Sequence, residues 1–123
     1  MGLTKKTEAS IELPWTSALL KNQSHVGNDM KLGHTKDCMK AMWDIKMLLT
    51  PWGYSFKAEP RIQVTITAYR PMTNIDAQSL EAAISDAIEQ GIHVNDSEYD
   101  INIIGKLDKV KPRIVIELSQ NSL

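Results

Sequence analysis

The segment from Arg61 to Arg70, RIQVTITAYR, most constrains what this 123-residue chain can fold into. Its apolar positions 62, 64, 66 and 68 alternate with polar ones, which is the two-residue period of a strand with one buried face. Glu59 and Pro60 stand before the segment and Pro71 follows it. The pattern predicts a strand whose apolar face belongs to the core and whose other face is polar.

The remaining elements follow from apolar spacing and from helix and turn signals. The expected elements are a short strand over Ser10–Leu13, a long loop over residues 14–34, a helix capped by Thr35 and ended by Pro51, a helix from Asp76 or Ala77 to Gln90 capped by Gly91, and strands over Tyr99–Leu107 and Arg113–Leu118. This order predicts one domain over residues 1–123. Its class is α/β (α+β), a small mixed β-sheet with two main helices packed on one face.

The first of these helices carries many apolar residues at spacings of three and four. The predicted inward face consists of Cys38, Met39, Met42, Trp43, Met47 and Leu49. We interpret its methionines as adaptable core filling and the single cysteine as a buried structural thiol. One cysteine also excludes an internal disulfide and a multi-thiolate zinc site.

Charge is segregated along the chain, although the formal net charge is only -1. No Lys or Arg occurs between Pro71 and Gly105, a region that holds the carboxylates Asp76, Glu81, Asp86, Glu89, Asp96, Glu98 and Asp100. The sequence on both sides is basic. Such an arrangement indicates either a carboxylate-bound divalent metal approached by a polyanion, or a solvated acidic helix in an ordinary domain.

The composition bounds the compartment as well. No apolar run approaches the roughly 20 residues that a membrane span requires, and the start MGLTKKTEAS lacks the apolar core of a signal peptide. We therefore expect a cytoplasmic protein without a membrane partner.

Three polar residues at the ends of predicted elements are candidate metal ligands. Asn74 and Asp76 follow the 61–70 strand, and Asp96 lies in the turn after the second helix. Residues i and i+2 of an extended segment point the same way, and we expect the helix and its return to bring Asp96 to the same edge of the sheet. Mg²⁺ prefers such oxygen ligands. The structural alternative is a helix N-cap for Asp76 and a turn residue for Asp96.

Several short stretches in this order carry a resemblance to a known family. They are Ile11-Glu12-Leu13-Pro14-Trp15, then Asn22, then VTITAYRP over residues 64–71, NID, SDAIEQGI, NDSEY and PRIVIEL. The layout resembles the RusA family of Holliday junction resolvases, which are crossover junction endodeoxyribonucleases of DNA recombination and repair. The resemblance implies a homodimer, encoded by a bacterium or phage, that grips a four-way DNA junction and nicks two opposed strands.

In that family an Asp-x-Asp pair and a later aspartate build the catalytic metal site. Applied to this sequence, the resemblance implies catalytic and metal-binding roles for Asp76, Asp96 and Asn74. It also implies Mg²⁺ as the cofactor, with Mn²⁺ as an alternative. Asn74 stands where the family has the first aspartate of the pair. The family also has a lysine in the first turns of the next helix, where this sequence has Leu80 and Glu81.

The expected function is metal-dependent, structure-selective cleavage of branched DNA. The expected DNA-binding cations are Lys21, Lys31, Lys36, Lys40, Arg70, Lys106, Lys109, Lys111 and Arg113. Such contacts position the phosphate backbone and carry little sequence information. Two alternatives remain open, which are a binding protein of the same fold that has lost cleavage, and a small interaction domain without a DNA role.

Overall fold

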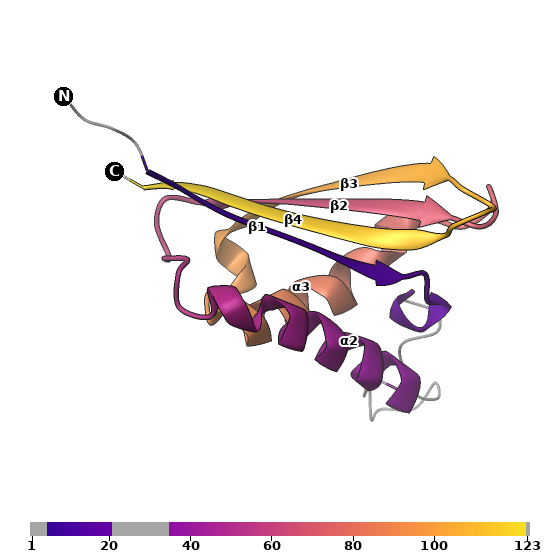
Figure 1. Ribbon diagram of the computed structural model, residues 1–123, viewed down its shortest axis with the longest axis horizontal. Helices are drawn as coiled ribbons and strands as arrows, with labels where there is room; N and C mark the ends of the chain where they lie inside the picture. The colour runs from indigo at the N-terminus through magenta and orange to yellow at the C-terminus, as the bar shows by residue number, and fades with distance from the viewer. Residues whose placement is uncertain (1–4, 21–34, 123) are drawn as a thin grey trace.

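The computed structural model describes residues 5–20 and 35–122, which form a four-stranded sheet with two α-helices packed on one face (Figure 1). With η for 3-10 helices, the elements are β1 (Lys5–Pro14), η1 (Ser17–Leu19), α2 (Lys36–Leu49), η2 (Thr50–Trp52), β2 (Ile62–Arg70), η3 (Ala77–Leu80), α3 (Glu81–Ile92), η4 (Asp96–Glu98), β3 (Tyr99–Leu107) and β4 (Arg113–Ser122). This architecture confirms the predicted α+β class.

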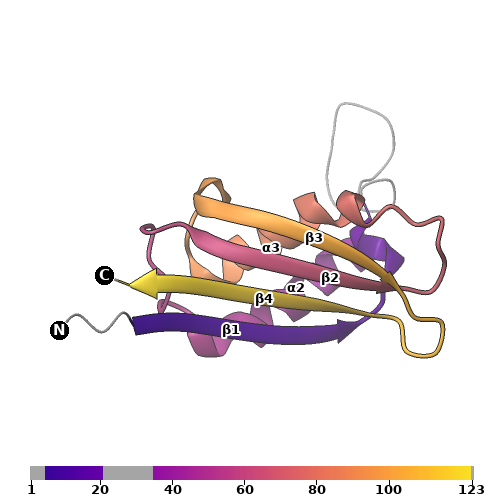
Figure 2. The ribbon, with the colours of Figure 1, turned by 90° about the horizontal axis from the view of Figure 1, so that it is seen from above.

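Strand β2 lies inside the sheet, whose order is β1-β4-β2-β3 (Figure 2). It pairs antiparallel with β4 and parallel with β3, so the sheet is mixed. The apolar residues Ile62, Val64, Ile66 and Ala68 are at most 1% exposed. The alternation read from the sequence therefore predicted the buried face of this strand correctly.

Strands β1 and β4 are longer than the sequence predicted. β1 begins at Lys5 rather than Ser10, and β4 continues to Ser122 rather than ending at Leu118. The two strands pair antiparallel over their whole length, from Lys5 with Ser122 to Pro14 with Arg113. Backbone pairing extends these strands through polar residues that give little periodic signal.

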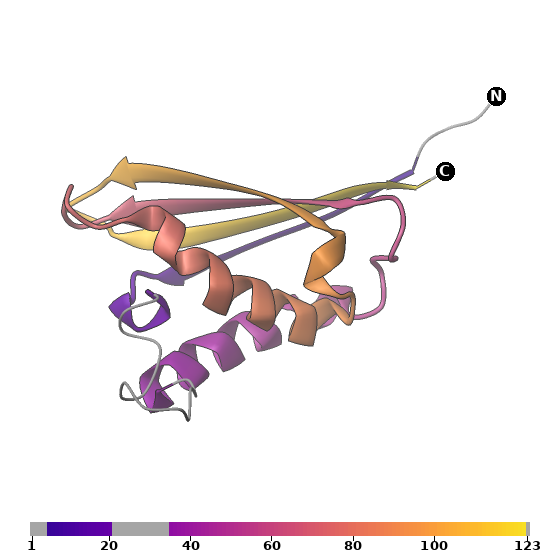
Figure 3. The ribbon, with the colours of Figure 1, turned by 180° about the vertical axis from the view of Figure 1, so that it is seen from behind.

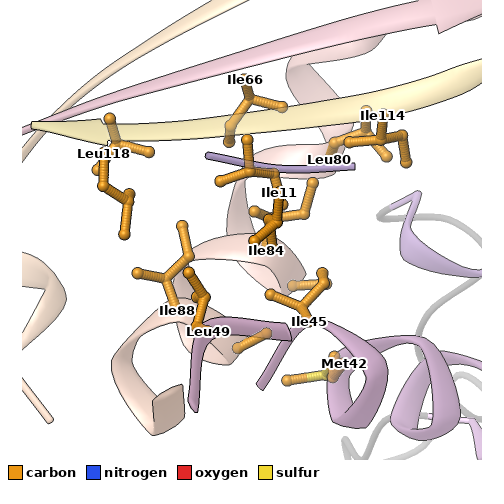
Figure 4. Packing of buried hydrophobic residues seen from close by; sticks show 14 of the residues in the cluster. Ile11, Met42, Ile45, Leu49, Ile66, Leu80, Ile84, Ile88, Ile114 and Leu118 are labelled. Carbon is orange, nitrogen blue, oxygen red and sulfur yellow. The ribbon is translucent and has the colours of Figure 1, made fainter. Parts of the chain in front are cut away.

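Aliphatic side chains fill the space between the sheet and the helices (Figure 4). The sheet contributes Ile11, Ile66, Ile114 and Leu118, and the helices contribute Ile45, Leu49, Leu80, Ile84 and Ile88. Burying one such side chain stabilises the fold by about 1.5–3 kcal/mol. The thiol of Cys38 is also buried, as predicted, and its burial raises the pKa of this group.

The parallel unit β2-α3-β3 fixes where the predicted site residues lie. Its register runs from Ile62 opposite Tyr99 to Arg70 opposite Leu107. β3 therefore starts beside the start of β2, and α3 returns beneath the sheet along the length of the strands (Figure 3). Residues just before α3 and residues just after it lie at opposite ends of the sheet.

The predicted inward face of α2 is wrong in part. Cys38, Met42 and Leu49 are buried, whereas Met39 and Trp43 are 58% and 54% exposed, and Met47 is exposed as well. The core side of the helix instead includes Ala41 and Ile45. Apolar residues cover more than one side of α2, so periodicity alone does not identify the side that faces the sheet.

The predicted cap of the second helix is also wrong. Gly91 lies inside α3, the helix ends at Ile92, and its C-cap is His93, whose φ of 63° is left-handed. The reason for a glycine at position 91 is the packing of α3 on α2. A Cβ there would lie 3.0 Å from the Cβ of Leu49.

This contact makes Gly91→Ala a test of the helix packing. Alanine in a helix gains about 1 kcal/mol over glycine, but over-packing a fixed core costs about 1–3 kcal/mol. Because Leu49 is fully buried and its Cβ cannot rotate away, we expect a net loss of stability of about 1 kcal/mol. Urea denaturation measures it, with exposed Ala82→Gly as the control for helix propensity. A stability equal to or above that of the unchanged protein contradicts this packing.

Candidate nucleic-acid interface

Asn74 and Asp76 lie in the loop between β2 and η3, and both are exposed. A carboxylate oxygen of Asp76 accepts a hydrogen bond from the N–H of Gln78 at 3.0 Å, so this residue caps η3. The carbonyl oxygen of Asp76 accepts from the hydroxyl of Ser79 at 2.7 Å. Asp76 is therefore a helix N-cap, as the structural alternative predicted, and one oxygen of its carboxylate makes this contact.

Arg70 holds this loop against the end of β3. Its guanidinium donates to the carbonyl oxygen of Ile75 at 2.7 Å and to that of Lys106 at 3.3 Å. Gly105 leaves room for this arrangement, because a Cβ there would lie 3.2 Å from the guanidinium carbon of Arg70 and 3.4 Å from the Cβ of Ala77. The loop with Asn74 and Asp76 is thus fixed beside the last residues of β3.

Asp96 lies in η4, immediately before β3. Its N–H donates to the carboxylate of Glu89 at 2.9 Å, and the Asn95 side chain accepts from the N–H of Ser97. The hydroxyl of Tyr99 donates to the carbonyl oxygen of Val94 at 2.7 Å. Burial raises the pKa of Tyr99 above its ordinary value, and the nearby carboxylates Glu89 and Asp96 raise it further. Asp96 therefore belongs to an acidic turn at the start of β3.

The structure does not bring Asp76 and Asp96 together in one chain, and this part of the prediction is wrong. Asp76 follows the end of β2, whereas Asp96 precedes the start of β3, which lies beside the start of β2. Nine strand residues separate these ends by roughly 25 Å. The sequence argument assumed that the chain returns to the same edge, but a parallel crossover returns it to the opposite one. Within the described residues, no group of three or more His, Cys, Asp or Glu side chains could hold a metal ion.

Most of the described candidate cations gather at the end of the sheet that carries Asn74 and Asp76. Arg70 ends β2, Lys106 is the penultimate residue of β3, and Arg113 begins β4. Lys109 and Lys111 lie in the turn between β3 and β4, which projects from this end (Figure 2). We call residues 106–113 the basic hairpin, although β3 and β4 each pair with β2 and not with each other, so this turn crosses the end of β2. It stands at the opposite end of the sheet from Asp96.

The other candidate cations lie elsewhere. Lys36 and Lys40 are exposed in the first turns of α2, in the helix layer, and Lys40 is 3.6 Å from the carboxylate of Asp44. Lys21 and Lys31 fall outside the described residues. Trp15, Asp37, Lys40 and Asp44 line a hollow of about 540 Å³ between the end of β1 and the start of α2. The matched Trp15 of the resemblance thus lies beside α2, at the opposite end of the sheet from Asp96.

The two arginines of the hairpin end are engaged within the chain, while the three lysines are exposed. Arg113 donates to the carboxylate of Asp108 at 2.9 Å, and its guanidinium stacks on the ring of Tyr69 at 3.7 Å. Lys111 is 3.9 Å from the carboxylate of Glu12. Lys106, whose ammonium nitrogen is 5.9 Å from the ring centroid of Tyr69, and Lys109 and Lys111 are therefore the exposed cations of this end.

Sequence reasoning missed Asp108, which organises the turn. One carboxylate oxygen accepts from the N–H groups of Val110 at 3.0 Å and Lys111 at 2.9 Å. The other binds Arg113, and the N–H of Asp108 donates to the carbonyl oxygen of Arg70 at 2.8 Å. These contacts, first the N–H of Lys111 and then Arg113, lower the pKa of Asp108. An Asp before a short polar turn is the signal that could have found this residue.

The fold and the site place this chain in the class of small α+β domains with a mixed four-stranded sheet and helices on one face. Neither protein-family models nor the curated proteins gave a significant match to the sequence. In the described part of the chain, no helix combines the length and the apolar composition needed to cross a bilayer.

The role of Asp108 predicts a pH-dependent hairpin. A carboxyl group with a lowered native pKa stabilises the fold at pH values above its ordinary pKa of 3.8, and this contribution is lost as the pH falls through the native pKa. We expect the amide resonances of Val110 and Lys111 to titrate below pH 3.8 in NMR spectra. Asp108→Ala should remove the exchange protection of both amides, and Asp108→Asn should remove less. Unchanged protection in Asp108→Ala contradicts this role.

Proposed function

We propose that this protein is a metal-dependent, structure-selective endonuclease that acts on branched DNA as a homodimer. The observation that carries the proposal is the basic hairpin beside Asn74 and Asp76 at one end of the sheet. Exposed lysines there offer charge to a phosphate backbone, and the adjacent oxygen ligands suit a divalent cation. The resemblance to RusA resolvases supports the same function, because its ordered stretches fall on β1, β2, α3 and β4.

A single chain does not fit the expected metal, because Asp76 and Asp96 lie at opposite ends of β2 and β3. A second copy can supply the missing acid. A two-fold axis perpendicular to the strands sets the two chains antiparallel, so the Asp76 end of one chain meets the Asp96 end of the other. The proposal therefore places each active centre between subunits, with Asn74 and Asp76 from one chain and the partner's Asp96.

The residues of this chain would divide the work at such a centre. Asp76 and the partner's Asp96 would supply negative oxygen ligands, and the amide oxygen of Asn74 would supply a neutral one. A bound Mg²⁺ would neutralise charge on the phosphate and lower the pKa of a water. Lys106 and Lys109 would hold the neighbouring phosphates of the strand. Two such centres related by symmetry match the two opposed strands of a junction.

A subunit-mixing experiment tests this arrangement on a synthetic four-way junction with Mg²⁺ or Mn²⁺. Asp76→Asn and Asp96→Asn should each abolish nicking, while Glu117→Gln on the open face of the sheet should leave it intact. When the two inactive variants are mixed and allowed to exchange subunits, half of the dimers hold one intact centre. We expect about a quarter of the original nicking rate, as single rather than paired nicks.

The outcomes separate the alternatives. No recovery in the mixture, from variants that do form mixed dimers, contradicts a centre shared between subunits. No nicking by the unchanged protein, in a dimer that binds junctions, contradicts the nuclease. Weak and salt-insensitive binding to all nucleic acids favours an interaction domain, since phosphate contacts make binding fall steeply with salt.

A second candidate function is junction binding without cleavage. It is favoured by Asn74, which brings no charge, and by Leu80 and Glu81 at the place of the lysine of the family. The variant Asn74→Asp restores the carboxylate at this position. If binding is the function, the unchanged protein should bind junctions without nicking them, and Asn74→Asp should create or greatly raise nicking. A junction gel assay measures both, and equal activity of the two proteins contradicts a weakened site.

A further inference from the structure

The tip of the basic hairpin exposes an apolar side chain. Val110 is 96% exposed, more than any other large apolar residue of the described chain. Lys109 and Lys111 flank it, and the turn projects beyond the ends of the strands (Figure 2). We propose that Val110 is a wedge that enters the base stack of DNA at a branch point, while the flanking lysines bind phosphates. This inference rests on the DNA ligand of the proposed function, but not on cleavage.

Contacts on both sides hold the turn that carries Val110. The backbone N–H groups of Val110 and Lys111 both donate to the carboxylate of Asp108, which also accepts from Arg113. Arg113 in turn stacks on Tyr69 of β2, and the N–H of Trp15 donates to the carbonyl oxygen of Pro112 at 3.2 Å. A turn fixed on both sides loses little conformational entropy when it binds. The exposure of Val110 is therefore a property of an ordered element.

The chemistry of the tip fits a nucleic acid with an interrupted stack. Apolar side chains such as Ile, Leu and Met insert between base steps in proteins that kink DNA, at a cost of a few kcal/mol for unstacking an intact step. At a branch point the stack is already interrupted, so the same insertion costs less. Lysines that contact only phosphates bind duplex and branched DNA alike. The wedge would supply the preference for branched DNA, and the lysines would supply affinity.

An anionic bilayer is the other surface that an apolar tip flanked by lysines could meet. Two observations favour DNA. The exposed large apolar residues of the basic hairpin are Val110 and the half-exposed Leu107, with Met72 in the neighbouring loop, and burial of so few apolar groups gives weak membrane binding. The hairpin also stands beside Asn74 and Asp76, the oxygen ligands expected next to a phosphate.

The experiment uses the full chain with EDTA, so that binding is measured without cleavage. A four-way junction with 2-aminopurine at the branch point reports unstacking as a rise in fluorescence, and a plain duplex of the same length is the reference. The unchanged protein should raise the fluorescence of the junction. Val110→Ala should lose most of this rise and about tenfold of junction affinity, with duplex affinity unchanged. Val110→Leu should retain both signals.

Matched variants separate insertion from charge. Lys109→Gln should weaken junction and duplex binding equally and reduce the salt dependence of both. Val115→Ala on β4 controls for the loss of a valine away from the tip. The proposal is overturned if Val110→Ala unstacks and binds the junction like the unchanged protein, or if Val110 governs binding to phosphatidylserine vesicles and not to DNA. If Val110→Ala still nicks the junction and still raises its fluorescence, the wedge is rejected and the nuclease is retained. If the unchanged protein unstacks the branch point in a Val110-dependent way but never nicks it, the nuclease is rejected and the wedge is retained.

Discussion

The parallel pairing of β2 with β3 is the constraint on which the rest of the structure depends. Because parallel neighbours must start at the same end, the chain has to travel back beneath the sheet, and α3 makes this return. The return creates the apolar layer between sheet and helices, to which α3 contributes Ile84 and Ile88. It also divides the acidic stretch between the two ends of the molecule.

This division gives the protein two chemically different ends. One end holds the basic hairpin together with Asn74 and Asp76, and the other holds the acidic turn around Asp96. At the acidic end, Arg61 donates to the carboxylate of Asp100 at 2.7 Å, and this contact lowers the pKa of Asp100. The proposed centre requires two antiparallel copies, and that arrangement would bring these opposite charges together.

The hairpin end is built as a single unit. The backbone of Arg70 accepts from Asp108, while its side chain holds the loop of Asn74 and Asp76, so one residue connects the loop to the turn. Arg113 and Asp108 then fix the turn against Tyr69. Such engaged arginines contribute order, and the exposed lysines remain available for an anion. A polar end of this kind can present ligands and cations in fixed relative positions, as an interface for phosphates needs.

The sequence by itself determined which segments become strands and helices. The alternation in residues 62–68 and the cap at Thr35 predicted β2 and α2, since period and capping are local properties. The bounds of β3 were predicted as Tyr99–Leu107, where the structure has them. The sequence also predicted the run of cations within residues 106–113.

Only the tertiary structure decided which residues share a place. It separated Asp76 from Asp96, turned Met39 and Trp43 outward, and gave Gly91 a packing role instead of a cap. These outcomes depend on strand direction and on the distance between helices, which no local pattern encodes. The sequence determined the elements because each forms from its own neighbours, and the fold decided the site because a site is made by residues that only pairing and packing bring together.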